Sequence, residues 1–159
     1  MIVLESTLSS KVKGLGRAMP AIRKATMLAV GQYWHNELLR KHFTIGAKFE
    51  YQHSRRSDTT LRAKTKAGAN PFIDLVASGE SERAMKHNAT ITATAKHVRI
   101  KMSVPAYFTN HSSGTLDMEK EATTISTRDR RKLSDLIDDE LTTRIRRAKI
   151  HIALEKVSS

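Results

Sequence analysis

Hydrophobic residues near the start of the chain recur at helical spacing, from about residue 15 to about residue 43. The apolar positions are Leu15, Met19, Ile22, Ala25, Ala29 and Tyr33, and Trp34, Leu38 and Leu39 extend the same surface. Steps of three and four residues place these side chains on one face of a helix. Pro20 fits the first turn, where no N–H is needed, so the helix begins at Leu15 or at Met19. Thr44 to Gly46 ends it.

The clearest strand pattern lies between residues 89 and 104. Apolar side chains occupy alternate positions, namely Ala89, Ile91, Ala93 and Ala95, then Val98, Ile100, Met102 and Val104. The positions between them carry threonines in the first run and His97, Arg99, Lys101 and Ser103 in the second. Two runs of period two joined by a tight turn predict an antiparallel hairpin. One face is apolar and packs inward, and the other carries threonines and positive charge.

A second long helix is predicted at the C-terminal end, to about Leu154. Ser126 to Asp129 has the spacing of a capping box. The apolar stripe that follows is Leu133, Ile137, Leu141, Ile145, Ala148 and Ile152. Acidic residues come early and basic residues late, which suits the helix macrodipole. About 28 residues make a rod of roughly 40 Å, so part of the stripe is expected to contact a neighbouring subunit.

The segments between these elements have weaker patterns. Alternation between Leu61 and Lys66 predicts a strand with a basic outer face, or an extended basic loop. Ser78 offers a helix N-cap, with Glu80 and Glu82 in the first turn, for a short helix to about Lys86. Residues 105–125 show no period and are predicted to form a long loop, which in a compact domain is usually functional.

The order of elements predicts an α+β fold. Long N-terminal and C-terminal helices pack on one face of a small antiparallel sheet that contains the hairpin. The 159 residues suit a single domain with a core from about 15 to 155. Hydrophobic residues make up 39% and charged residues 28%, which favours a folded chain over a disordered one.

The start of the chain and its amino-acid content exclude several classes. The absence of cysteine excludes disulfides, thiolate metal sites and cysteine nucleophiles. Met1 to Leu4 lacks the basic flank of a signal peptide, and no apolar run is long enough to cross a bilayer. We therefore expect no membrane association.

The net charge of +12 indicates an acidic partner, either a nucleic acid or an acidic protein. Between Arg40 and Lys66 there are eight Lys or Arg and two acidic residues. The candidates for contact with DNA phosphates or an acidic partner are Arg55, Arg56, Arg62, Lys64, Lys66, Arg99 and Lys101. Such residues bind phosphates without reading bases. Few aromatic residues accompany them, which disfavours a base-stacking single-strand binder.

Motifs for catalysis are weak. His35 and His42 share a helix face but lie two turns apart, so with His53 they are predicted to be surface or partly buried side chains. No metal and no cofactor is predicted. Ser78-Gly79 lacks the first glycine of a nucleophile elbow and is better explained as a cap.

A metal-dependent nuclease would suit a basic protein and is kept as a further hypothesis. Such an enzyme needs clustered carboxylates to hold Mg²⁺. The candidate groups are Asp74 with Glu80 and Glu82, and Asp117 with Glu119 and Glu121.

A sequence of loose motifs spans about residues 15 to 145. They are aromatic residues late in the first helix (Tyr33-Trp34 through His42-Phe43), a basic segment, and the run Pro71-Phe72-Ile73-Asp74-Leu75-Val76-Ala77-Ser78-Gly79-Glu80. The hairpin, Pro105-Ala106-Tyr107, His111-Ser112-Ser113-Gly114 and a final helix follow. In order and spacing the chain resembles the neck and tail-completion proteins of tailed phages, including the lambda-like siphophage families. Many relatives carry a Pro-Arg-Phe-like segment before the last helix. Thr123 to Arg128 holds none, which leaves open whether the chain is a terminator, a completion protein or a connector.

The resemblance implies a structural virion protein and no enzyme. It would be assembled in the host cytoplasm into a ring, commonly sixfold, at the head–tail junction. The implied partners are copies of itself, neighbouring neck and tail proteins, and the genomic DNA in the lumen. The subunit-contact candidates are Tyr107, Phe108, His111, Leu116, Met118, Ile145 and Ile152. The alternative hypothesis is a nonspecific nucleic-acid-binding protein that acts alone.

Overall fold

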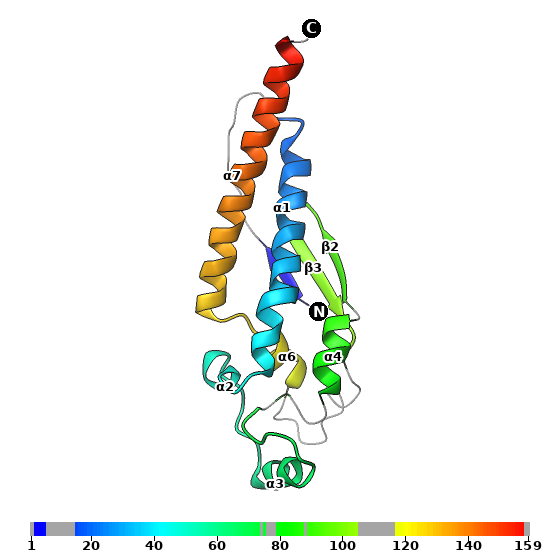
Figure 1. Ribbon diagram of the computed structural model, residues 1–159, viewed down its shortest axis with the longest axis vertical. Helices are drawn as coiled ribbons and strands as arrows, with labels where there is room; N and C mark the ends of the chain where they lie inside the picture. Colours follow the sequence, from blue (N-terminus) through cyan, green and yellow to red (C-terminus); the bar gives the residue numbers. More distant parts are fainter. Residues whose placement is uncertain are drawn as a thin grey trace.

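The computed structural model describes residues 2–5, 15–73, 75, 79–87, 89–104 and 117–157, with side chains as far as Lys149. Helices and a small antiparallel sheet are both present, so the predicted α+β class is confirmed. The molecule is elongated, and the C-terminal helix runs along much of its long axis (Figure 1). Within the described part of the chain, no helix is both long enough and apolar enough to cross a membrane.

The first helical run has the predicted extent but changes its winding. It consists of α1 (Met19–Tyr33), a π-helical stretch η1 (Trp34–Leu38) and a 3₁₀ stretch η2 (Leu39–Phe43). Pro20 lies in the first turn, as predicted, and the run ends before Thr44. Trp34, Leu38 and Leu39 are completely buried, so the aromatic end of this run forms the centre of the main core.

The sheet consists of β1 (Ile2–Glu5), β2 (Ala89–Ala93) and β3 (His97–Met102), in the order β1-β3-β2. The predicted hairpin is confirmed, with Ile91 opposite Ile100 and Thr92 opposite Arg99. The strand β1 was not predicted. It pairs antiparallel with the free edge of β3 and places Val3 opposite Arg99. Ile2, Val98 and Ile100 are buried on the inner face, while Thr92, Arg99 and Lys101 are exposed on the outer face.

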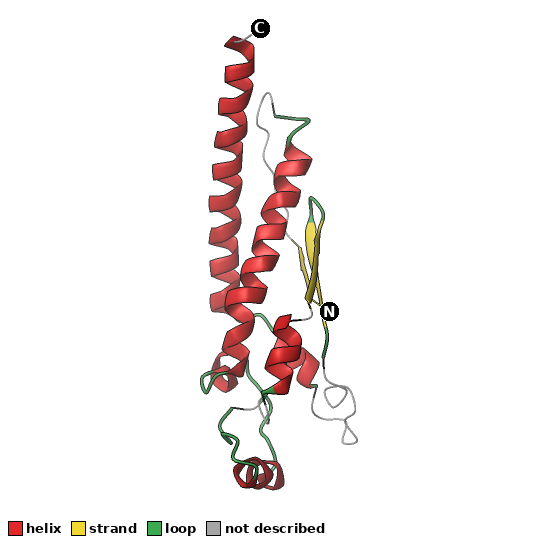
Figure 2. Ribbon diagram, turned by 45° about the vertical axis from the view of Figure 1, so that its right-hand side comes forward, coloured by secondary structure: helices red, strands yellow, loops and turns green. Residues whose placement is uncertain are grey.

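The helix α1 lies between the sheet and α7 (Thr127–Val157), as Figure 2 shows. Gly31 makes this close packing possible. A Cβ at this position would lie 2.5 Å from Val98 Cγ2 and 3.1 Å from Ile91 Cγ2. Only a residue without a side chain therefore lets α1 approach the sheet so closely.

Replacing Gly31 by valine is expected to lower the free energy of unfolding by about 2 kcal/mol, because an overpacked core must shift backbone or strain rotamers. Urea unfolding followed by circular dichroism measures the change. Gly16→Val is the matched control, since a Cβ at Gly16 meets nothing within 4 Å. Equal stability of the two variants would contradict this account of the α1–sheet contact.

The predicted apolar stripe of α7 packs against other residues of the same chain. Leu133 joins the main core, and Leu141, Ile145 and Ala148 pack against a second cluster of Leu15, Met19 and Ile22. Ile145 was expected to contact a neighbouring subunit. It packs on the end of its own α1 and stays partly exposed, so that contact stays a prediction. The C-terminal end of α7 extends past α1 (Figures 1 and 2). Ile152 lies in this end, where side chains are not described.

The prediction of a strand or loop at residues 61–66 is wrong, because this segment forms the helix α3 (Asp58–Lys66). The hydroxyl of Ser57 caps it by accepting from the Thr60 N–H. A one-turn helix α2 (Ala47–Glu50) precedes it, and α4 (Glu80–His87) confirms the predicted short helix. The proposed cap of α4, Ser78, lies outside the described residues.

The predicted loop at residues 105–125 contains a short helix, α6 (Met118–Thr123), capped by Asp117. Met118 packs against the protein's own core and stays partly exposed, so its prediction as a subunit contact stays a prediction. The other subunit-contact candidates of this segment, Tyr107, Phe108, His111 and Leu116, lie outside the described residues.

Candidate functional site

The basic candidate residues divide into an exposed group and a buried group. Arg55, Arg62, Lys66, Arg99 and Lys101 are exposed. Arg56 and Lys64 are buried, with 4% and 8% of their surface exposed. The structure therefore corrects the prediction of Arg56 and Lys64 as residues that face DNA or an acidic partner.

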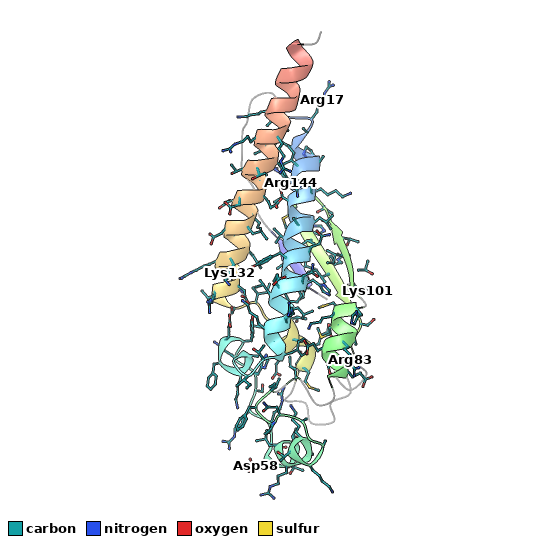
Figure 3. The ribbon with its side chains drawn as sticks, in the orientation of Figure 1. Arg17, Asp58, Arg83, Lys101, Lys132 and Arg144 are labelled. Carbon is teal, nitrogen blue, oxygen red and sulfur yellow. The ribbon has the colours of Figure 1, made fainter. Side chains whose placement is uncertain are left out.

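Arg99 and Lys101 lie on the outer face of the sheet, which α1 does not cover. Thr90 and Thr92 stand opposite them on β2 and are also exposed. Figure 3 shows Lys101 at the side of the molecule that carries β2 and β3. This outer sheet face offers two fixed cations among hydroxyl groups, which suits contact with phosphates and provides no base readout.

Arg62 and Lys66 lie on α3, at the end of the long axis opposite the C-terminus (Figure 1). Asp58, at the start of the same helix, is labelled there in Figure 3. The sheet lies beside the middle of the molecule. Four of the exposed basic candidates thus form two separate surfaces. Arg62 and Lys66 lie on α3, and Arg99 and Lys101 lie on the outer sheet face.

The Arg56 side chain forms a buried ion pair with Glu121 of α6. Its Nη2 lies 2.5 Å from Glu121 Oε2, and its Nη1 lies 3.1 Å from Oε1. The Ser54 N–H donates to the same Oε1 at 2.8 Å. Burial alone would raise the pKa of Glu121, but these hydrogen bonds outweigh it and hold the pKa below its usual value. Lys64 is turned inward in a similar way and donates to the Ile73 carbonyl at 2.6 Å.

A second buried carboxylate, Asp129, ties α7 to the segment after α1. Its oxygens accept from Tyr51 Oη and from Lys41 Nζ, both at 2.7 Å. Burial opposes ionisation, but these donors keep the pKa of Asp129 below its usual value. Burial and the bond to Asp129 raise the pKa of Tyr51. The predicted cap is confirmed in part, since the Ser126 hydroxyl accepts from the Asp129 N–H at 3.1 Å while the Asp129 carboxylate faces Tyr51 and Lys41.

The two carboxylates flank a stack of aromatic rings. The centroids of the His42 and Tyr51 rings lie 3.7 Å apart, and the His53 ring lies beside this pair, 6.2 Å from each of them. The His42 Nδ1–H donates to the Glu121 carbonyl at 3.0 Å. Burial, then the nearby His53, lowers the pKa of His42 to about 4. These histidines, and His35 bonded to the Met85 carbonyl, are buried, so their prediction as surface or partly buried residues is wrong.

This network fixes structure rather than presenting reactive groups. It joins η2 and the residues after α2 to α6 and to the start of α7. Three of the acidic nuclease candidates have structural roles: Glu121 pairs with Arg56, Glu82 pairs with Lys86, and Asp117 caps α6. Asp74 lies outside the described residues, among which no cluster of three His, Asp or Glu side chains is placed to hold a metal ion.

An exposed apolar surface, here called the aromatic patch, was missed by the sequence reasoning. Ile45, Phe49 and Phe72 are 58%, 85% and 72% exposed. They line a groove of about 230 Å³, completed by Lys48, Arg55, Leu61 and Pro71 among others. The signal was present, because Phe49 and Phe72 are large apolar residues at the two ends of a polar, basic segment.

Comparisons with protein-family models, with curated proteins and with solved structures found no significant match to this chain.

Proposed function

We propose that this protein is a structural subunit of the head–tail junction of a tailed phage. It forms a ring that completes the tail or connects it to the head, and the DNA passes through the ring. The aromatic patch carries this proposal. Its two phenylalanines and one isoleucine are large apolar side chains exposed to solvent. Such a group marks a surface that another protein covers.

The shape of the subunit supports assembly. α7 runs along the long axis and extends past α1, and α3 extends the opposite end (Figure 1). An elongated subunit offers long flanks to neighbours, and both β1 and β2 are edge strands of the sheet. Exposed strand edges are further sites for contact between chains.

The outer sheet face supports a position against DNA. Arg99 and Lys101 would face phosphates in the lumen of the ring, where cations without base readout allow the genome to pass whatever its sequence. The proposal assigns no catalytic step, metal or cofactor to this chain. Its partners are copies of itself, the adjoining neck and tail proteins, and the genomic DNA, and its place is the virion.

Labelling purified virions tests the proposal. A gold-conjugated antibody against this protein is expected to bind at the junction between head and tail. Cells infected with a phage carrying a stop codon in this gene are expected to accumulate filled heads and tails that do not join. Label on the capsid or tail tip, or normal virions without the protein, would overturn the proposal.

A second candidate function, nonspecific binding of nucleic acid by the monomer, is favoured by the same Arg99 and Lys101. Replacing both by glutamate would then weaken duplex DNA binding at least tenfold and flatten its salt dependence. Fluorescence anisotropy at several salt concentrations measures this, with Arg62→Glu/Lys66→Glu on α3 as the matched control. Tight binding by a monomer that never assembles would favour this function over the ring.

A further inference from the structure

A cleft elsewhere on the structure is also lined mainly by apolar side chains. It lies between β1, α1 and the first half of α7 and has a volume of about 380 Å³. We call it the apolar cleft, and its lining residues are Val3, Leu4, Met27, Val30, Ile125, Arg130, Leu133, Ser134 and Ile137. No residue belongs to both surfaces.

We propose that the aromatic patch of one copy docks into the apolar cleft of the next copy. This contact rests on the proposed function, since it would repeat from subunit to subunit around the ring. Two different surfaces of one chain that bind each other make a heterologous contact, and such contacts close into rings when the rotation between subunits allows it.

The size and chemistry of the two surfaces match. Phe49 and Phe72 are mostly exposed in the patch, and each aromatic side chain buries a large apolar area when a partner covers it. The cleft volume falls in the range of roughly 300–1,000 Å³ in which protein sites enclose compact groups. Six of the cleft residues are aliphatic, from Val3 to Ile137, and Met27 adds an adaptable side chain. Arg130 also lines the cleft, and its guanidinium is a favourable neighbour for an aromatic ring.

The charges beside the two surfaces also match. Lys48 and Arg55 line the groove of the aromatic patch. Ser134 lines the apolar cleft, and the exposed acidic residues of α7 follow it directly at Asp135, Asp138 and Asp139. Asp138 lies one turn after Ser134 and therefore stands next to the cleft on the solvent side. The contact would bring these opposite charges together.

A symmetric contact between two aromatic patches fits less well. A two-fold axis would place Lys48 and Arg55 of one copy near the same cations of the other, which opposes association. The flank of α7 also carries a cation in the cleft, Arg130, but it presents three exposed carboxylates, Asp135, Asp138 and Asp139, which the groove of the patch does not.

Removing the aromatic side chains is the first test. Phe49→Ser/Phe72→Ser is expected to raise the concentration needed for assembly at least tenfold, measured by sedimentation velocity. Both side chains are exposed, so circular dichroism and the unfolding midpoint should stay unchanged. Lys24→Ser, an exposed change on α1 outside both surfaces, is the control. Assembly by the double variant at the wild-type concentration would overturn the contact.

Engineered cysteines give the sharper test, because the chain has no cysteine of its own. With Lys48→Cys and Asp138→Cys in the same chain, oxidation is expected to give a ladder of covalent oligomers that ends at the ring size. Neither single variant should cross-link. Dimers of the Lys48→Cys variant alone would show a symmetric contact and overturn the proposal.

The two levels of the proposal can fail separately. Rings in electron micrographs without cross-links in the double-cysteine protein would overturn this contact and leave the ring function intact. Wild-type protein that forms neither rings nor cross-linkable oligomers would overturn both.

Discussion

Replacing Glu121 by alanine is expected to lower the free energy of unfolding by about 3–5 kcal/mol. The change removes the carboxylate that accepts two hydrogen bonds from the buried Arg56 guanidinium. The Ser54 N–H loses its acceptor in the same step. Breaking one side of a buried ion pair costs more than the pair contributes, since the remaining charge stays out of water.

Urea unfolding at pH 7 measures this loss, with Lys120→Ala, an exposed change in the same helix, as the control. The double variant Arg56→Met/Glu121→Leu should recover part of the stability, because it removes both charges together. If Glu121→Ala unfolds at the same urea concentration as Lys120→Ala, the ion pair does not hold the residues after α2 against α6.

Lowering the pH from 7 to 4 is expected to cost about 3 kcal/mol of stability through His42 alone. The pKa of His42 is lowered in the fold to about 4, from an ordinary value of 6.5. Below pH 6.5 the His42 side chain binds a proton in the unfolded chain, whereas in the folded protein it stays neutral down to about pH 4. The contribution of neutral His42 is therefore complete above pH 6.5 and is lost as the pH falls through this range.

The buried carboxylates of Glu121 and Asp129 affect stability at lower pH than His42 does. The pKa values of Glu121 and Asp129 are lowered in the fold, so their contribution is present above the ordinary carboxyl pKa and is lost as the pH falls through the folded value. Between pH 6.5 and pH 4 the slope of stability against pH thus reports mainly on His42.

Unfolding midpoints measured at intervals between pH 7.5 and pH 4 test the role of His42. His42→Phe should flatten the slope in this range, even if its loss of the bond to the Glu121 carbonyl lowers stability at pH 7. His87→Gln, a change of an exposed histidine on α4, should leave the slope as in the wild type. A slope that is equally steep in His42→Phe would contradict the assignment.

Most of the fold could be predicted because its elements are long and strongly periodic. The run from Met19 to Phe43, the hairpin and α7 each bury one regular face. The strand β1 could not be found, since four residues carry no period and their role depends on the free edge of β3. The segment of α3 was predicted to be a strand or an extended loop, because small or apolar residues alternate between Leu61 and Thr65. The same three residues also fit a short, mostly exposed helix.

The site was harder to predict, because burial of a charge depends on partners distant in sequence. Arg56 and Glu121 are 65 residues apart, and Lys41 and Asp129 are 88 apart. Nothing local distinguishes Arg56, which is buried, from Arg55, which is exposed. The aromatic patch was missed for the opposite reason: a phenylalanine in a polar segment is normally expected to turn inward.

Electron microscopy of the purified protein at high concentration tests the ring most directly. We expect class averages that show closed rings with rotational symmetry and an open centre wide enough for duplex DNA. Particles that remain single subunits at every concentration, or that grow into open filaments, would contradict a subunit built to encircle the genome.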